Sequence, residues 1–262
     1  MTSSGDFVEL RERAAVGWVV RELADLGMAA FWQPLAPLPL AKGRGGVGRL
    51  VLAGRELVVR PYRRGGALGA LLRDRYASPS RARRELQVLA ALRHEGVPVV
   101  VPIAAVARRT GAFWRLRLCT ERVADALPAP AFLAAQPSHR RAAAEAIGTV
   151  VRLAFNAGLL HPDLHPDNVL CCMRGDKVRA VLVDLDRARL RPPLLPRDRI
   201  AMLARMQRYV LRHVGKLAAV PTRAETMRFL RAILSERELR HATWREVAKR
   251  LHRALLRRLR RH

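Results

Sequence analysis

Three polar residues near the middle of the chain have the types and spacing that a phosphoryl-transfer site needs. Asp163 and Asn168 lie in the segment His161-Pro-Asp-Leu-His-Pro-Asp-Asn168, and Asp184 follows in Val181-Leu-Val-Asp-Leu-Asp186. A carboxylate can accept or orient the proton of an attacking hydroxyl, while an amide and a carboxylate can hold Mg²⁺ on nucleotide phosphates. The three side chains therefore predict the centre of a phosphotransferase.

The residues around them predict elements that would bring them together. Residues 138–157 have helical periodicity, with Ser138 as the expected N-cap and Gly158 just past the end. Residues 169–173 and 177–183 are expected to be strands joined by a tight turn. The loop with the first carboxylate would therefore lead into a hairpin that ends at the second.

The N-terminal half predicts an antiparallel sheet with one helix. Residues 50–52 and 56–60 are typical of a hairpin, and two further extended segments are expected at 97–103 and 112–118. Residues 80–93 have the apolar spacing of a helix. Two earlier segments are expected to form an amphipathic helix and an irregular lead-in: residues 6–26 and 30–40.

A glycine-rich segment, Gly43-Arg-Gly-Gly-Val-Gly-Arg49, precedes the hairpin. Glycine has no Cβ, so it lets backbone N–H groups approach phosphates closely. The same composition is typical of an ordinary turn, and both interpretations stay open. A Walker A loop is excluded because no Gly-Lys-Ser/Thr sequence follows.

Composition excludes several classes of protein. The chain has 262 residues, enough for one large domain or two small lobes that share a cleft. No apolar run approaches the roughly 18–20 residues of a membrane span, and residues 1–6 lack the features of a signal peptide. A cytoplasmic protein is therefore expected. The three cysteines form neither a disulfide framework nor a zinc-binding pattern.

The net charge of +27 is extreme, and only four of the 49 basic residues are lysine. Such a field attracts anionic partners such as nucleic acid, anionic lipid or phosphorylated sugars. Helices are expected at 198–214, 222–235 and 242–261, and nine arginine or lysine residues follow from Arg240 onward. The last helix could lie on an anionic membrane surface, or its leucines could pack it against the rest of the lobe.

Four motifs together resemble one known family: HPDLHPDN, LVDLDRAR, GRGG and VVRPYRRGG. The chain is similar, over roughly residues 40–235, to the 3-deoxy-D-manno-octulosonic acid (Kdo) kinase family of the lipopolysaccharide kinases, within the protein-kinase-like superfamily. The resemblance implies an α+β, two-lobed fold. An N-lobe of residues 1–122 would contain an antiparallel sheet with one helix, and residues 123–262 would form a mostly helical C-lobe.

The resemblance also implies roles for residues of the C-lobe. Asp163 would accept the proton of the acceptor hydroxyl or orient that hydroxyl. Asn168 and Asp184 would hold Mg²⁺, and Asp186 could help. Two histidines have less specific expectations, since His161 would brace the loop or simply pack in the core, and His165 could orient the loop or the substrate.

In the N-lobe the resemblance implies a nucleotide site with one departure from the kinase pattern. Arg60 stands where kinases have a strand lysine, and it would pair with Glu85 and contact the α- and β-phosphates. Backbone groups of Glu121 and Val123 would contact adenine. Four glycines would cover the nucleotide: Gly43, Gly45, Gly46 and Gly48.

The family's reaction implies ATP and Mg²⁺ as cofactors and a Kdo-bearing lipid A precursor as acceptor, phosphorylated on the Kdo 4-hydroxyl. This acceptor sits in the cytoplasmic leaflet of the inner membrane, so a peripheral protein on that anionic surface is expected. Candidate contacts to the acceptor are the C-terminal arginines and four others: Arg63, Arg64, Arg73 and Arg75.

Two alternatives stay open. Another kinase on the same scaffold could act on core heptose, an aminoglycoside or a protein. A nucleic-acid-binding protein with a degenerate kinase fold would also suit the charge. No nucleic-acid partner is expected, because the catalytic triplet is intact and aromatic residues, which would stack on bases, are only 5% of the chain.

Overall fold

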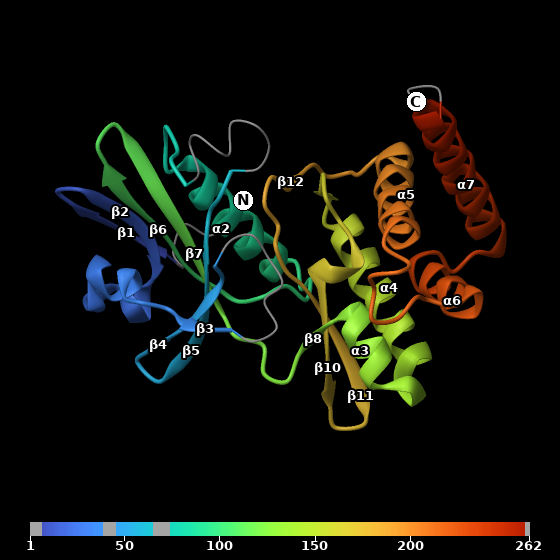
Figure 1. Cartoon of the computed structure of the whole chain (residues 1–262), viewed down its shortest axis with the longest axis horizontal. Helices are drawn as coiled ribbons and strands as arrows, with labels where there is room; N and C mark the ends of the chain where they lie inside the picture. The colour runs from blue at the N-terminus through green and yellow to red at the C-terminus, as the bar shows by residue number, and fades with distance from the viewer. Residues whose placement is uncertain (1–6, 39–45, 65–73, 260–262) are drawn as a thin grey trace. The chain divides into compact units, whose positions relative to one another are not determined.

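The computed structural model describes residues 7–38, 46–64 and 74–259 (Figure 1). The chain divides into two compact units by its internal contacts. The first contains Met1–His94 and Val100–Val123, and the second contains Glu95–Val99 and Ala124–His262. The first unit is built on a large sheet, and most helices belong to the second. The α+β class expected from the sequence is therefore confirmed.

The first unit contains a seven-stranded sheet in the order β1-β2-β6-β7-β5-β4-β3, with every neighbouring pair antiparallel. Among the described residues of this unit, one α-helix, α2, accompanies the sheet, together with two 3₁₀ helices, η1 and η2. The bounds are β1 Phe7–Glu12, β2 Ala15–Val20, η1 Arg21–Leu26, η2 Met28–Trp32, β3 Ala36–Pro37, β4 Gly48–Leu52, β5 Arg55–Pro61, α2 Ser80–His94, β6 Pro102–Thr110 and β7 Phe113–Glu121.

The expected helix at residues 6–26 is wrong. The structure has the hairpin of β1 and β2 there, followed by the 3₁₀ helix η1. Strand β2 pairs with β6, more than eighty residues later in the chain, and this distant partner decides the conformation. Glycine at position 17 lets Met28 pack closely against this strand, because a Cβ there would lie 2.6 Å from the Met28 sulfur.

The register of the sheet places the residues expected to serve the nucleotide. Leu57 and Val59 of β5 are fully buried in the core, so Arg60 projects from the opposite face of the strand. Strand β5 lies inside the sheet between β4 and β7, with Arg60 opposite Leu118. Helix α2 buries Glu85 together with its leucines. Arg60 and Glu85 therefore belong to two well-packed elements.

The second unit contains five α-helices and two small sheets among its described residues. The hairpin of β10 and β11 has a continuous antiparallel register from Val169↔Leu182 to Arg174↔Lys177, as the sequence predicts. The bounds are β8 Leu127–Pro128, α3 Ala129–Ala135, η3 Pro137–His139, α4 Arg140–Asn156, β9 Leu159–Leu160, η4 Pro166–Asn168, β10 Val169–Arg174, β11 Lys177–Leu182, β12 Arg189–Leu190, α5 Pro196–Arg212, α6 Arg223–Ile233 and α7 Arg237–Leu259.

The ends of α4 agree with the sequence only in part. Gly158 lies just past the end and has a φ of +80°, which favours glycine. The expected N-cap at Ser138 is wrong, because that residue lies in the 3₁₀ helix η3 and no side chain caps α4. Pro137 starts this separate 3₁₀ turn, so the α-helix begins only at Arg140.

The expected strand at residues 97–103 also differs, since β6 begins at Pro102. Val99 instead forms an isolated parallel bridge with Leu182 in the second unit. Within the described part of the chain, no helix is both long enough and apolar enough to span a membrane.

Candidate active site

The loop of residues 161–168 is built around the buried imidazole of His161. The backbone N–H of Asp163 donates to His161 Nδ1 at 2.9 Å, so this nitrogen must be the acceptor. The proton of the neutral ring therefore lies on Nε2, which donates to the backbone carbonyl of Asp184 at 2.9 Å. One side chain thus connects the backbones of the two residues expected to carry the catalytic carboxylates.

The environment of His161 favours this neutral form. Burial lowers the pKa of His161, and hydrogen bonding to the Asp184 carbonyl opposes that shift only in part. A protonated ring would place an N–H at Nδ1 against the N–H of Asp163. Of the two interpretations that the sequence allows, the contacts favour a brace for the loop.

Asn168 holds the other end of the loop. Its side-chain Nδ2 donates to the Asp163 carbonyl at 3.1 Å, and its own backbone carbonyl accepts from the N–H of Val183 at 2.9 Å. The first bond closes the loop, and the second brings Asn168 next to the residue before Asp184. Because the amide nitrogen is used within the loop, the amide oxygen is the end of the side chain that can bind a cation.

Asp184 follows the hairpin in an unusual conformation. Its φ is +54°, in the left-handed region that side chains other than glycine seldom adopt, and the residue is exposed. Such strain often accompanies functional sites. Asp186 lies in the next turn and is half-buried. Their roles as metal ligands stay predictions.

The residues present fit a magnesium ion shared with a nucleotide. Among the described residues, no three His, Cys, Asp or Glu gather into a metal site. Mg²⁺ is usually held by one or two carboxylates together with substrate phosphates, and seldom by an all-protein cage. The Asn168 amide oxygen and the Asp184 carboxylate are donors of the right kind for such a site.

Helix α5 packs against this loop through residues that the sequence did not single out. The Met202 sulfur accepts from the backbone N–H of His161, and Arg205 donates to the carbonyls of His161 and Pro162. Tyr209 donates to Asp167. The three helix residues are spaced i, i+3 and i+7, which places them on one face. The sequence contains this spacing and so predicts a shared helix face. It does not reveal which loop that face contacts.

In the first unit the expected pair of Arg60 and Glu85 forms. Arg60 Nη2 lies 2.6 Å from each carboxylate oxygen of Glu85. The hydroxyl of Tyr62 donates to the same carboxylate at 2.5 Å, and the Arg60 guanidinium lies 4.6 Å from the centre of the Tyr62 ring. Tyr62 is a further residue that the sequence did not reveal. An arginine in place of the usual lysine is therefore firmly held.

The glycines of the expected nucleotide loop are only partly described. Gly43 and Gly45 lie outside the described residues. Gly46 has a φ of +61°, in the left-handed region that favours glycine. Gly48 lies in β4, where a Cβ would come within 2.5 Å of the Leu35 Cβ. Packing alone explains glycine at this last position.

The segment expected to contact adenine has one backbone group already used. The N–H of Glu121 donates to the Val101 carbonyl at 2.9 Å, so a contact from Glu121 to adenine would use its carbonyl. Val123 ends the first unit, two residues past β7. The adenine contacts stay predictions.

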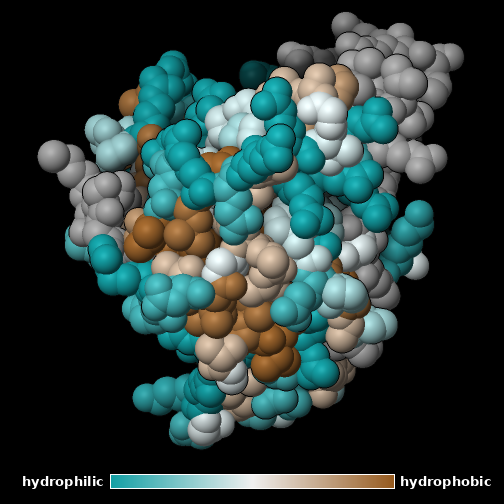
Figure 2. All heavy atoms as spheres, turned by 90° about the vertical axis from the view of Figure 1, so that its left-hand side faces the viewer, coloured by the Kyte–Doolittle hydropathy of each residue, from teal (hydrophilic) through white to brown (hydrophobic). Residues whose placement is uncertain are grey.

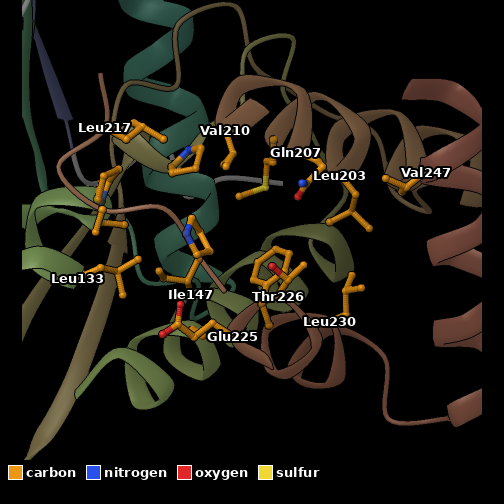
Figure 3. Close-up of a pocket in the computed structure, with 18 of the residues that line it drawn as sticks. Leu133, Ile147, Leu203, Gln207, Val210, Leu217, Glu225, Thr226, Leu230 and Val247 are labelled. Carbon is orange, nitrogen blue, oxygen red and sulfur yellow. The ribbon is translucent and has the colours of Figure 1, made fainter. Parts of the chain in front are cut away.

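An apolar pocket lies among the helices of the second unit (Figure 3). Helices α3 to α7 all contribute to its walls, and Pro166, between Asp163 and Asn168 in the sequence, also lines it. In Figure 3 the side chains of Ile147, Leu203 and Leu230 surround this space. Helix α5 therefore contributes both to this pocket and to the support of the loop.

Figure 2 shows one face on which hydrophilic residues surround smaller apolar patches. Several arginines are paired, as in the contacts of Glu56 with Arg49 at 2.8 Å and Arg122 at 2.7 Å. These arginines, led by Arg122, lower the pKa of Glu56. With 49 basic against 22 acidic residues, the sequence has no acidic counterpart for an excess of 27 basic residues.

Comparison with known proteins identifies relatives that match most of the chain. The model of the lipopolysaccharide kinase (Kdo/WaaP) family matches residues 31–233. A 3-deoxy-D-manno-octulosonic acid kinase of Vibrio parahaemolyticus is 30% identical over 191 residues, which cover 69% of this chain and 79% of the relative. The Xylella fastidiosa kinase of the same name is 30% identical over 195 residues, 73% of this chain and 76% of the relative.

A solved structure described as WaaP in complex with acyl carrier protein has a similar fold. It matches with a TM-score of 0.59 and 22% identity, over 86% of this chain and 90% of that one. At this level of identity the likeness concerns the fold alone. The protein-kinase-like fold expected from the sequence is confirmed.

Proposed function

Because the chain belongs to the lipopolysaccharide kinase (Kdo/WaaP) family, we propose that it transfers the γ-phosphoryl group of ATP to the 4-hydroxyl of a Kdo residue on a lipid A precursor. The coarser activity, that of a phosphotransferase with a hydroxyl acceptor, follows from the family. One observation carries the proposal: the Asp163 side chain is 77% exposed, while its backbone is fixed by the buried His161.

Asp163 is arranged to serve an acceptor hydroxyl. Phosphoryl transfer needs little covalent chemistry from the protein, so positioning and electrostatic stabilisation supply most of the rate. The exposed carboxylate would accept or orient the hydroxyl proton as the oxygen attacks the γ-phosphorus. His161 and Asn168 hold the backbone on both sides of the carboxylate, and this limits the positions it can take.

Asn168 and Asp184 would hold Mg²⁺ through the amide oxygen and the carboxylate. When bound there, the ion would neutralise charge that develops on the phosphate oxygens. His161 contributes from the protein side, because its bond to the Asp184 carbonyl fixes the residue that carries the ligand. Asp186 is a candidate for a further ligand.

On the nucleotide side, Arg60 would contact the α- and β-phosphates. Glu85 and Tyr62 hold its guanidinium in place, so little side-chain freedom remains to be lost when a phosphate binds. Gly46 and the glycines before it would cover the phosphates with backbone N–H groups.

The proposed acceptor would account for two other features of the chain, its arginines and its apolar pocket. A Kdo-bearing lipid A precursor carries a carboxylate and phosphates, to which Arg63, Arg64 and Arg75 could donate. It also carries acyl chains, whose chemistry suits the apolar pocket beside the loop. We also propose that the protein works at the cytoplasmic face of the inner membrane, with the basic helix α7 against anionic lipid.

Mass spectrometry of the acceptor tests the function. The Kdo-bearing lipid A precursor is incubated with the protein, ATP and Mg²⁺, and one added phosphate on the Kdo 4-hydroxyl is the expected product. Parallel reactions contain a heptose-bearing core, an aminoglycoside and a protein substrate. Phosphate on one of these, with none on Kdo, would reject the proposed acceptor but keep the phosphotransferase.

Flotation with anionic vesicles tests the membrane proposal. Binding is expected at low salt and should weaken as salt rises, because salt screens interactions between exposed charges. A neutral vesicle of the same size is the control. No binding to anionic vesicles at either salt concentration would reject a membrane surface as partner.

A further inference from the structure

One aromatic residue of α5 contacts the catalytic loop at two points. The hydroxyl of Tyr209 donates to Asp167 Oδ2 at 2.5 Å. Its ring stacks on His165, with centroids 4.3 Å apart and planes only 8° from parallel. The His213 ring lies on Tyr209 at 4.2 Å. Tyr209 therefore contacts the residues on both sides of Pro166, His165 and Asp167.

In the hydrogen bond between Tyr209 and Asp167, the Tyr209 hydroxyl is the donor. Burial, then the bond to Asp167, raises the pKa of Tyr209, so the hydroxyl keeps its proton at ordinary pH. Asp167 directly precedes Asn168, which we assign to the metal. The hydroxyl therefore holds the side chain of the residue just before the proposed ligand.

His165 depends on this stacking for its orientation. Its side chain is only 16% exposed, and Nε2 lies 4.0 Å from Asp163 Oδ2. Its other nitrogen, Nδ1, is buried and has no hydrogen-bond partner in the part of the chain that the structure describes. Polar contacts therefore leave the plane of the ring undetermined, and the parallel face of Tyr209 is the contact that sets it.

We propose that Tyr209 is a positioning residue for phosphoryl transfer, which holds the His165 ring against the Asp163 carboxylate. The inference rests on the proposed function and adds to it a path from α5 to the reacting carboxylate. When the His165 ring is fixed, it occupies one side of the exposed Asp163 carboxylate. Fewer orientations are then available to that carboxylate. The acceptor hydroxyl then meets the carboxylate in a reactive geometry.

A purely structural role for Tyr209 would have a different signature. Loss of packing between α5 and the loop would lower stability and the folded fraction, but kcat per folded molecule would stay the same. Loss of positioning lowers kcat, because a misplacement of about 1 Å can cost about 100-fold in rate. The KM for ATP should change little in that case, because Arg60 and Glu85 belong to the other unit.

Steady-state kinetics of matched variants separate the two roles. Tyr209→Leu removes the stack and the hydroxyl, and kcat should fall about 10- to 100-fold with KM for ATP within about twofold. Tyr209→Phe keeps the stack and should retain most of the activity. Leu211→Ala changes an exposed residue of the same helix and should behave as the wild type.

A double-mutant cycle with His165→Ala tests the path itself. If Tyr209 acts through His165, the Tyr209→Leu/His165→Ala variant should be no more than about twofold slower than His165→Ala alone. Wild-type kcat in Tyr209→Leu, or effects that multiply in the double variant, would overturn the inference. Equal losses in Tyr209→Phe and Tyr209→Leu would also overturn it, because the stack would then be irrelevant.

The same assays keep this inference apart from the proposed function. Normal transfer to Kdo by the wild type and by Tyr209→Leu contradicts the inference alone. Absence of transfer by the wild type to any hydroxyl acceptor contradicts the proposed function, and the inference with it.

Discussion

Each unit of the molecule contains a buried pair of arginine and glutamate, and the two pairs are almost alike in geometry. Arg60 and Glu85 of the first unit approach to 2.6 Å, with side chains 23% and 2% exposed. Arg140 and Glu225 of the second unit approach to 2.7 Å, with side chains 22% and 7% exposed. Neither distance nor burial distinguishes their roles.

Their other contacts do distinguish them. Arg140 also donates to the carbonyls of Leu133 and Val220, and Glu225 forms a capping box with Thr222 at the start of α6. All these contacts join segments of the second unit's own framework.

Arg60 stands instead on a central strand, at the position where kinases have a lysine for the nucleotide phosphates. Under the proposed function, Arg60 and Glu85 form the functional pair, which is recognised by its place in the fold. The strength of its contacts does not identify it.

Of the changes to these two pairs, Glu85→Gln should have the largest effect. The change leaves Arg60 without its carboxylate, so the guanidinium loses the orientation needed for the phosphates. We expect kcat/KM for ATP to fall about 100-fold, measured by steady-state kinetics at saturating acceptor. A value within about twofold of the wild type would place this pair in the same structural class as the other.

Glu225→Gln is the matched change in the second unit. It should lower the free energy of unfolding by about 1–3 kcal/mol, because the half-buried Arg140 charge loses its partner. Kinetics per folded molecule should stay at the wild-type level. Urea denaturation and an assay on the same sample give both quantities, and a large loss of kcat with unchanged stability would reverse the assignment.

Arg60→Lys should have a smaller effect than Glu85→Gln. Lysine keeps the positive charge but lacks the planar guanidinium, whose Nη2 contacts both oxygens of Glu85. We expect kcat/KM for ATP to fall about tenfold, with the free energy of unfolding reduced only slightly. The same change at Arg140 is the control, and ATP kinetics should not respond to it.

The smallest expected effect is on the stability of the protein at low pH. Hydrogen bonding to Arg140, more than any other cause, lowers the pKa of Glu225 from the ordinary 4.5. A lowered folded-state pKa means that the contribution to stability is complete above the unfolded value and is lost as the pH falls through the folded one. Between pH 7 and pH 3, the urea midpoint should therefore fall further for the wild type than for Glu225→Gln. Parallel curves for the two proteins would contradict this role of the pair.

Much of the second unit could be predicted from sequence because its determinants are local. The periodicity of residues 138–157, the glycine after them and the hairpin around Arg174–Asp176 each specify structure over a few residues. The spacing of Asp163, Asn168 and Asp184 belongs to one compact stretch. The structure confirms these helices and strands and brings the three residues together.

The rest depends on contacts between distant residues. Strand β2 forms on β6, and only that pairing turns the segment predicted as a helix into a hairpin. Tyr209 reaches Asp167 across 42 residues of sequence, and Tyr62 reaches Glu85 across 23. Periodicity can place such residues on a face, but it does not name the partner. The supporting residues of both sites were therefore missed, and the roles of the central residues stay predictions.

The central claim is that the exposed carboxylate of Asp163 promotes phosphoryl transfer without contributing to the fold. Asp163→Asn tests it most directly, through the rate of phosphate transfer to the Kdo-bearing precursor and the urea midpoint of the same preparation. We predict a loss of about 100- to 10,000-fold in kcat, with an unchanged midpoint because the side chain is 77% exposed. Wild-type kcat in this variant would contradict the claim.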